Sequence, residues 1–252
     1  MGVPLIGCKC PVCSSKDPKD KRLRPSGLIQ IGDKNILIDV GPDFRIQALQ
    51  YGIETLDGVF ITHIHADHVA GVDDLRIFYF KTQKKLDCFL SKETFEDLKV
   101  RYSYLFRPIN SVPTVSAQLN INLLEEEYGT FSFLDHNFHY VSYSQGGVKV
   151  NGFRIGDLAY ISDIKDYDRE IFKQLKGVNT LILSAVGNGG SKVHLSLQDA
   201  VAFADKVGAK KAYFTHLSHH FLHEKINSEL PENRQLAYDG QRIEFSEELC
   251  QK

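Results

Sequence analysis

The chain has 252 residues, of which 42% are hydrophobic and 25% charged, values that suit one large globular domain or two small ones. Its 30 Lys and Arg residues against 32 Asp and Glu residues give a formal charge of −2, which argues against a protein that coats nucleic acid through a basic surface. No apolar run approaches the roughly eighteen residues that a membrane span needs, and the start of the chain lacks the features of a signal peptide. We therefore expect a single domain over residues 1–252, located in the cytoplasm and away from membranes.

The first half of the chain alternates short strands with helices. A turn at Gly32-Asp33-Lys34 separates the first two strands, and Ser91 is a suitable N-cap for the second helix. The predicted elements are strands 27–31, 35–40 and 58–62, a helix from about Val69, and a helix over 91–106.

The second half begins with sequential strands and ends in alternating strands and helices. Strands are predicted over 130–144, 148–155 and 158–162, with turns at Gly146-Gly147 and Gly156-Asp157. A helix over 167–175, a strand over 180–186, a helix from Ser196 to Gly208 and a strand over 212–217 follow. Hairpins early and βα units late predict an α/β (α+β) protein, a four-layer αββα sandwich of two mixed sheets between helices.

Potential metal ligands are densest in residues 62–71, which read THIHADHVAG directly after an apolar strand. His63 and His65 are two residues apart and can share one face of extended backbone, whereas Asp67 and His68 follow where the chain turns into a helix. Imidazole with some carboxylate is a donor set that zinc and similar metals prefer. The spacing predicts two metals side by side, one at His63 and His65 and the other at Asp67 and His68. The alternative is a polar loop whose histidines only form hydrogen bonds.

Three of the five cysteines, Cys8, Cys10 and Cys13, lie within six residues. In a reducing compartment such crowding indicates a metal site more often than disulfides. A structural zinc takes four tetrahedral ligands, so the three thiolates need a fourth. Three free thiols in a mobile loop are the alternative. We expect Cys88 in the core and Cys250 in the C-terminal tail.

Several motifs, taken in chain order, resemble the landmarks of a known superfamily. Residues 63–68 look like the HxHxDH motif of the metallo-β-lactamase superfamily. Residues 36–41 resemble its acidic strand, residues 159–163 the strand ending in the bridging aspartate, and residues 213–216 the strand ending in the last histidine ligand. Residues 7–13, 215–219 and 237–240 are similar to one branch, which includes the phosphodiesterase of the carbon–phosphorus lyase pathway.

The resemblance implies the metallo-β-lactamase fold and a set of active-site ligands. His63 and His65 would bind a first metal, and Asp163 would bridge it to a second. The second metal would be held by Asp67, His68 and His216. Zn²⁺ or Mn²⁺, as one or two ions, would hold a hydroxide near neutral pH and offset the charge of a phosphodiester.

The resemblance also implies supporting residues. Asp39 would hydrogen-bond a ligand histidine and fix its tautomer, although a strand-end cap is the alternative. His194 would approach the substrate phosphate as general acid or oxyanion stabiliser and, with Asp67, is a candidate catalytic residue. His219 would be the fourth ligand of a structural Zn²⁺ at Cys8, Cys10 and Cys13.

The sequence departs from the branch at Gln145, where relatives carry a histidine some seven residues before the Gly152-Phe153-Arg154 element. An amide oxygen is a weak, neutral ligand, so Gln145 would be a weak or absent ligand. His139 would need a different register to replace it, because six extended residues span about 20 Å, and His136 fits less well. We therefore expect a first metal site weaker than the second, which favours reduced activity.

A second departure is at the start, where relatives have a strand and a glycine-rich turn before the element that here is Gly2-Val3-Pro4. We expect the first N-terminal strand of the fold to be missing, unless the sequence is truncated at its start. Its neighbour would then expose unpaired backbone groups, which favours a homodimer.

These observations favour a metal-dependent phosphodiesterase that acts on small cyclic or nucleotide-like phosphodiesters. One alternative is an RNA-processing endoribonuclease, although nucleic acid is not favoured by the balanced charge. Others are thioester or lactam hydrolysis on the same metals, and a catalytically impaired metal- or nucleotide-binding protein, which Gln145 favours. Arginines near the motifs are candidates either for substrate phosphate contacts or for structural roles. They are Arg22, Arg24, Arg45 and Arg76.

Overall fold

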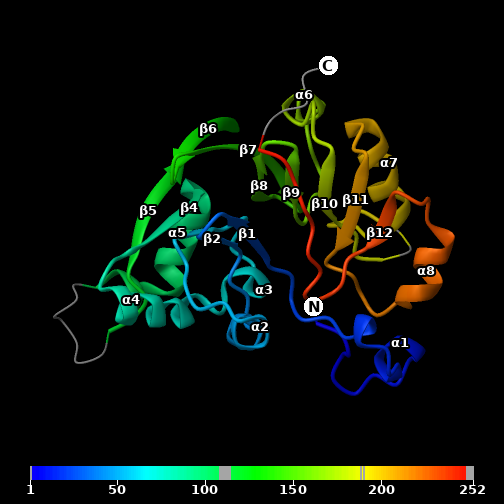
Figure 1. The fold of residues 1–252 in the computed structure, drawn as a ribbon, viewed down its shortest axis with the longest axis horizontal. Helices are drawn as coiled ribbons and strands as arrows, with labels where there is room; N and C mark the ends of the chain where they lie inside the picture. Colours follow the sequence, from blue (N-terminus) through cyan, green and yellow to red (C-terminus); the bar gives the residue numbers. More distant parts are fainter. Residues whose placement is uncertain (1, 108–114, 188, 190, 248–252) are drawn as a thin grey trace. The chain divides into compact units, whose positions relative to one another are not determined.

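The computed structural model describes residues 2–107, 115–187, 189 and 191–247. The chain divides into two compact units, one formed by Arg24–Glu125 and the other by Met1–Leu23 together with Glu126–Lys252. Each unit contains one β-sheet (Figure 1). Cys250, predicted to lie in the C-terminal tail, is outside the described residues. The prediction of a single domain over 1–252 stays a prediction.

The unit formed by Arg24–Glu125 contains a five-stranded sheet in the order β1-β2-β3-β4-β5. Its strands are β1 (Gly27–Ile31), β2 (Lys34–Ile38), β3 (Gly58–Phe60), β4 (Leu86–Ser91) and β5 (Leu119–Leu124). Only the β1–β2 pair is antiparallel. The central strands β2 and β3 are apolar on both faces, as expected for parallel strands covered on both sides. β1 is the edge strand, and the described residues before it form one isolated bridge, between Val3 and Arg22.

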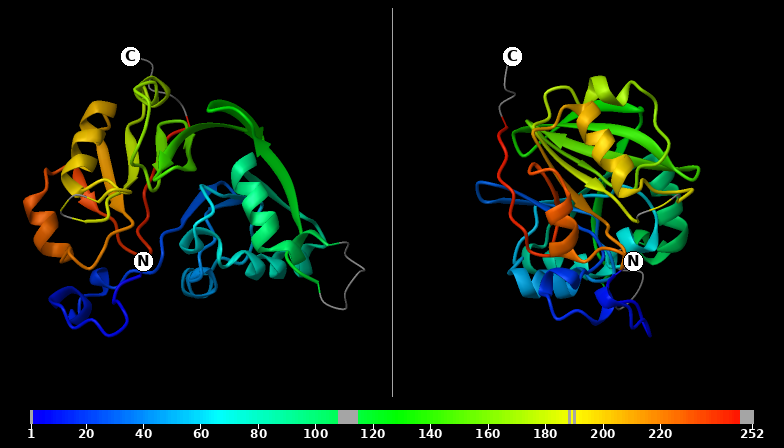
Figure 2. Two further views of the ribbon diagram at one scale, coloured as in Figure 1. Left: turned by 180° about the vertical axis from the view of Figure 1, so that it is seen from behind. Right: turned by 90° about the vertical axis from the view of Figure 1, so that its right-hand side faces the viewer.

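Helices of this unit follow the strand ends. They are α2 (Phe44–Tyr51), α3 (Ala66–Val69), η2 (Val72–Leu75), α4 (Arg76–Thr82), α5 (Lys92–Arg101) and η3 (Ser103–Phe106). The N-cap prediction is confirmed, because the Ser91 hydroxyl accepts a hydrogen bond from the Thr94 amide. The predicted helix over 91–106 is nevertheless broken at Tyr102 (φ −121°) into an α-helix and a 3₁₀ turn. Figure 2 shows α5 running along β4 and β5.

The other unit contains a seven-stranded sheet in the order β12-β11-β10-β9-β8-β7-β6. Its strands are β6 (Tyr128–Phe133), β7 (His136–Gln145), β8 (Val148–Ile155), β9 (Leu158–Ile161), β10 (Thr180–Ser184), β11 (Lys211–Thr215) and β12 (Arg234–Leu236). β6 to β9 form an antiparallel meander, and β9 to β12 are parallel. The expectation of two mixed sheets, with hairpins and later βα units, is confirmed.

The prediction of a single strand over 130–144 is wrong, because two strands, β6 and β7, cover this region. The chain reverses at Leu134 and Asp135, whose φ angles of 53° and 65° suit the tight hairpin between β6 and β7. Asp135 tolerates such an angle, but Leu134 does not favour it and no glycine is present, so the turn signal in the sequence is weak. β4 and β5 were also not predicted, nor were α8 (His223–Glu229) and β12.

The helices of the second unit are α1 (Pro11–Ser14), η1 (Pro18–Asp20), α6 (Ile171–Gln174), α7 (Leu197–Val207) and α8. α6 is shorter than predicted, whereas α7 has the predicted start: Ser196 and Asp199 form a reciprocal capping box. α7 packs on β10 and β11, and α8 on β12 (Figure 2). Phe203 of α7 and Phe214 of β11 lie in the core between these layers. No helix in the described part of the chain is long and apolar enough to cross a membrane.

The strand directions determine where polar side chains collect. In the five-stranded sheet, Asp39 and residues 62–65 follow the carboxyl ends of the adjacent parallel strands β2 and β3. In the seven-stranded sheet, Asp163 follows β9 and His216 follows β11 at one carboxyl edge. β7 runs parallel to β9, because both are antiparallel to β8, so Gln145 ends at that same edge. Such edges are where ligands bind in open α/β sheets.

Candidate metal centres

A buried carboxylate organises the histidine motif after β3. Asp39 is fully buried, and its oxygens accept hydrogen bonds from the Thr62 amide and hydroxyl, both at 2.8 Å. Its Oδ2 also lies 2.7 Å from Nδ1 of His68. A carboxylate at this distance holds the ring proton on Nδ1, which leaves the Nε2 lone pair to act as a ligand. The predicted contact of Asp39 with a ligand histidine is therefore made, with His68.

His63 and His65 turn ring nitrogens toward the same point. Nε2 of His63 lies 2.9 Å from Nδ1 of His65, and Nδ1 of His63 lies 2.9 Å from the Thr62 hydroxyl. Two imidazole ligands of one tetrahedral zinc have nitrogens about 3.3 Å apart, close to this spacing. The local backbone therefore gives both histidines the shared face that their spacing predicts. Thr62 was not singled out from the sequence, although its position directly before the motif was the available signal.

Two glycines allow the chain to cross itself tightly beside the motif. A Cβ on Gly41 would lie 2.3 Å from the Asp67 carbonyl oxygen, and one on Gly71 would lie 2.2 Å from the Gly41 carbonyl oxygen. Val40 and His68 are also joined by a backbone hydrogen bond of 2.8 Å. The close crossing brings the segment after β2 against the start of α3, so that Asp39 reaches His68.

The seven-stranded unit brings together a second cluster, formed by Asp163, His194 and His216. Ligand atoms of the three side chains lie within 4.8 Å of one another. Oδ1 of Asp163 is 3.4 Å from Nε2 of His216 and 3.7 Å from Nδ1 of His194, and the two imidazole rings are stacked at 5.4 Å. A buried carboxylate between two imidazoles is a donor set that suits a divalent metal such as zinc.

Backbone strain is concentrated at these positions. Asp39, Asp163 and His216 have φ angles of 61°, 51° and 58°, a region that non-glycine residues seldom adopt. The other non-glycine residues with positive φ in the described chain are Gln83, Leu134 and Asp135, at a helix end and in a hairpin turn. Strained conformations inside a packed structure are typical of functional sites.

Gln145 lies beside His194. Its side-chain Nε2 is 3.1 Å from Nδ1 and 3.2 Å from Nε2 of that ring. His139 is six residues earlier in β7 and pairs with Arg154 across the sheet, away from the carboxyl edge. His136 contacts Glu247 at 2.5 Å. In the seven-stranded unit, neither of these two histidines joins the Asp163 cluster.

His194 is fixed through its backbone as well as its ring. The Ser191 hydroxyl accepts a hydrogen bond from the His194 amide at 3.1 Å, and the Lys165 ammonium donates to the His194 carbonyl at 3.3 Å. Neither residue could be predicted from the sequence, because both contacts depend on how the loop before α7 folds.

The three clustered cysteines meet His219. Their Sγ atoms lie 3.4, 3.6 and 3.7 Å from its Nδ1. Bond lengths of about 2.3 Å to sulfur and about 2.0 Å to nitrogen put tetrahedral S and N ligands about 3.5 Å apart, so the residues fit a zinc ion. The Cys13 amide, followed by the Cys8 and Cys13 thiols and the His219 ring, lowers the pKa of Cys10 to about 6, which favours the thiolate that a metal requires.

The candidate arginines are mostly engaged with protein groups. Arg22 is buried and contacts Asp20, Ser218 and Phe221. Arg24 pairs with Asp43 at 3.0 Å and Arg76 with Asp73 at 3.2 Å, whereas Arg45 is exposed. Of the two roles predicted for Arg22, the structural one fits, because its guanidinium is enclosed by protein.

Comparison with known proteins gives the family. The family described as "Beta-lactamase superfamily domain" matches residues 34–217, which include the histidine motif, Asp163 and His216. The chain belongs to the metallo-β-lactamase superfamily. The αββα fold class expected from the sequence is confirmed by this membership and by the two mixed sheets with their helices.

Individual metallo-β-lactamase relatives differ in name. The crystal structure of a diphosphatase of the PhnP family superposes with a TM-score of 0.89 over 97% of this chain and 92% of that one. The two sequences are 37% identical. The octanoyltransferase of Porphyromonas gingivalis is 35% identical over 95% of this chain but only 48% of its own length, so the chain spans about half of that relative. The short form of human tRNase Z, at 16% identity and a TM-score of 0.69 over 90% of this chain and 94% of that one, shares the fold alone.

Proposed function

We propose that this metallo-β-lactamase superfamily member is a metal-dependent phosphodiesterase for small cyclic or nucleotide-like phosphodiesters. The observation that carries the proposal is the pair of donor clusters at the carboxyl ends of parallel strands. One consists of His63, His65, Asp67 and His68, and the other of Asp163 and His216. The similarity to a PhnP-family diphosphatase over nearly the whole chain supports a substrate that contains phosphate.

We assign ligands to each metal in the order that the superfamily motif implies. By that motif, His63 and His65 would hold the first metal, Asp67, His68 and His216 would hold the second, and Asp163 would serve both. Zn²⁺ or Mn²⁺ would lower the pKa of a water molecule and offset the negative charge of a phosphodiester. Gln145 offers the first metal a weak, neutral ligand or none, so the first site is the weaker of the two.

The residues around these ligands orient them and handle protons. The Asp39 carboxylate keeps the His68 proton on Nδ1, and Thr62 holds both Asp39 and His63. His194 stacks on His216 and is anchored at its backbone by Ser191 and Lys165. From that position its ring can donate a proton to the leaving oxygen, or a hydrogen bond to the phosphate oxygens as their charge grows.

Hydrolysis of bis-p-nitrophenyl phosphate with added Mn²⁺ or Zn²⁺ tests the proposal. We expect turnover in the wild-type chain that falls at least about a hundredfold in Asp67→Asn, because one metal ligand and catalytic carboxylate is lost. Asp97→Asn, on the exposed face of α5, is the matched control and should keep wild-type turnover. Absence of turnover with either metal would overturn the proposal, and nucleotide binding without turnover would then support the impaired binding protein.

A second candidate is hydrolysis of an acyl ester or thioester. The observation in its favour is the relative named octanoyltransferase, which is similar to 95% of this chain. An octanoyl thioester of N-acetylcysteamine, offered beside the phosphodiester, distinguishes the two. Preference for the thioester, lost in Asp67→Asn, would favour acyl transfer to water.

An RNA-processing role is less favoured, because the formal charge of −2 provides little electrostatic attraction for a polyanion.

We also propose the structural Zn²⁺ at Cys8, Cys10, Cys13 and His219, because the sulfur–nitrogen distances match tetrahedral coordination. Elemental analysis of the purified chain should find it even when the active-site metals are removed by a mild chelator. A cytoplasmic location and a homodimer remain predictions.

A further inference from the structure

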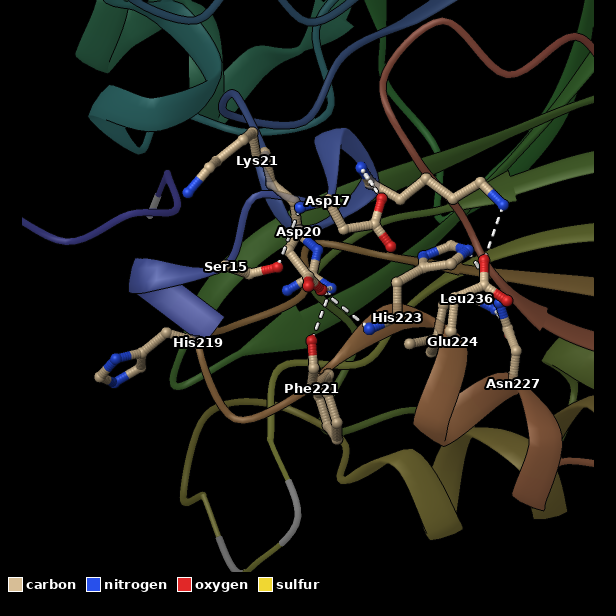
Figure 3. A network of polar contacts seen from close by, with 12 residues as sticks. Ser15, Asp17, Asp20, Lys21, His219, Phe221, His223, Glu224, Asn227 and Leu236 are labelled. Carbon is tan, nitrogen blue, oxygen red and sulfur yellow. Dashed lines mark hydrogen bonds and ion pairs between the residues drawn. The ribbon is translucent and has the colours of Figure 1, made fainter. Parts of the chain in front are cut away.

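One buried guanidinium holds the loop that carries His219. Nη1 of Arg22 donates to the Ser218 carbonyl at 3.1 Å, and Nη2 donates to the Phe221 carbonyl at 2.7 Å. The two carbonyls lie on either side of His219 in the sequence. Figure 3 shows the Phe221 carbonyl oxygen and the His223 amide nitrogen facing the region of Asp20, whereas the His219 side chain points away from them. The loop is thus held from one side, and its metal-binding imidazole projects from the other.

Arg22 is itself fixed in place. Its side chain is 5% exposed and pairs with Asp20, whose carboxylate lies 3.4 Å away and is also buried. The Asp20 carboxylate accepts a second hydrogen bond, at 2.8 Å, from the His223 amide. The charge of the guanidinium is therefore balanced, and the same carboxylate anchors the far end of the loop.

The main chain of Arg22 holds the other half of the metal site. Arg22 and Val3 exchange two backbone hydrogen bonds, of 2.7 and 2.8 Å, five residues before Cys8. Val3 packs with Val12 and Cys13 in a small buried cluster. One residue thus contacts both the segment with the three thiolates and the loop with the imidazole.

The loop is also tied to the seven-stranded sheet at its end. Asn227 Oδ1 accepts a hydrogen bond from the Leu236 amide at 2.8 Å, which turns the Asn227 amide nitrogen toward Nε2 of His223, also at 2.8 Å. In Figure 3, His223 lies between Asp20 on one side and Asn227 and Leu236 on the other. The position of His219 is therefore set by contacts that do not include a metal.

Resting on the structural zinc site proposed above, we propose that Arg22 is a positioning residue for the cysteine–histidine site, holding His219 in its ligand position before the metal binds. The ligands come from segments more than two hundred residues apart in the chain, so an unsupported site would have to order both segments when the metal arrives. Preorganisation removes that cost and raises the affinity. The planar guanidinium suits the task, because its two nitrogens reach two carbonyls at once and a lysine ammonium does not reproduce that geometry.

The test measures zinc affinity in Arg22→Lys by competition with a chromophoric chelator, together with the thiolate-to-metal absorption of the Co²⁺-substituted site. We expect affinity at the cysteine site to fall about tenfold or more, the equivalent of one charge-assisted hydrogen bond. Arg234→Lys is the matched control, because Arg234 is also 5% exposed, pairs with Asp205 at 2.7 Å and donates to the Asn233 carbonyl at 3.1 Å. Its zinc affinity should stay within about twofold of wild type.

A second measurement needs no variant. In the metal-free wild-type chain, amide hydrogen exchange over residues 218–223 should remain protected, because the Arg22 contacts persist without metal. Unchanged zinc affinity in Arg22→Lys, rapid exchange in the metal-free loop, or a wild-type chain that binds no metal at the cysteines would each overturn the proposal.

Discussion

The amide nitrogen of Gln145 lies 3.1 Å from Nδ1 and 3.2 Å from Nε2 of His194. Nearly equal distances to both ring nitrogens put the amide nitrogen over the face of the ring, because a position in the ring plane would clash with the carbon between the two nitrogens. Gln145 is 4% exposed, and its Oε1 has no hydrogen-bond partner among the described residues. The residue that the sequence suggests as a weak metal ligand is thus in contact with the candidate general acid.

Replacement of His194 tests the catalytic assignment. His194→Ala should lower turnover of the phosphodiester by about a hundredfold or more, the usual scale for a group that transfers a proton in the transition state. The active-site metal content, measured by elemental analysis, should stay unchanged, because His194 is not among the assigned ligands. Undiminished turnover would remove the assignment, and loss of a metal would instead make His194 a ligand.

Gln145→His tests the weak first metal site. An imidazole replaces a neutral amide at the carboxyl edge of the sheet, so the first metal should bind more tightly. We expect the wild-type chain to hold less than two tight equivalents at the active site and Gln145→His to approach two. The zinc at the cysteine site is subtracted by repeating the metal count in Cys10→Ser, in which that site lacks one ligand. Two tight active-site equivalents in the wild type would contradict the prediction.

Asp39→Asn tests the support of His68. The amide keeps the size of the carboxylate but loses its charge, so it no longer favours the proton on Nδ1 of His68. Active-site metal affinity should fall between about tenfold and a hundredfold, the usual effect of removing such a partner. Zinc at the cysteine site should be unaffected and serves as the internal control. Equal active-site affinity in variant and wild type would show that Asp39 is only a strand-end cap.

His223 predicts a pH dependence of stability. Burial, followed by the nearby Lys19 charge, lowers the pKa of His223 below its usual value. The unfolded chain therefore binds the proton more readily than the folded chain, so this contribution is present above about pH 6.5 and is lost as the pH falls through the lower, folded pKa. Urea unfolding should show a smaller loss of stability on acidification in His223→Gln than in the wild type. Parallel curves for the two proteins would contradict this origin.

Local features of the site could be predicted from the sequence because neighbouring residues determine them. The spacing of His63 and His65 after an apolar strand is enough to turn both rings to one face, and three cysteines in six residues indicate a metal by their number. The αββα class followed from the order of hairpins and βα units. The turn at Leu134 and Asp135 was missed because its positive φ angles are imposed by the pairing of β6 with β7, not by the residues themselves.

Only the tertiary structure decided which distant residues become neighbours. Gln145, Asp163 and His216 share an edge because β7, β9 and β11 run in the same direction, and the contact of Gln145 with His194 depends on the fold of the loop before α7. Arg22 became a buried structural residue because two carbonyls and a carboxylate enclose it. Sequence spacing determines which side chains share a face over a few residues, whereas strand register and loop closure bring together groups that are far apart in the chain.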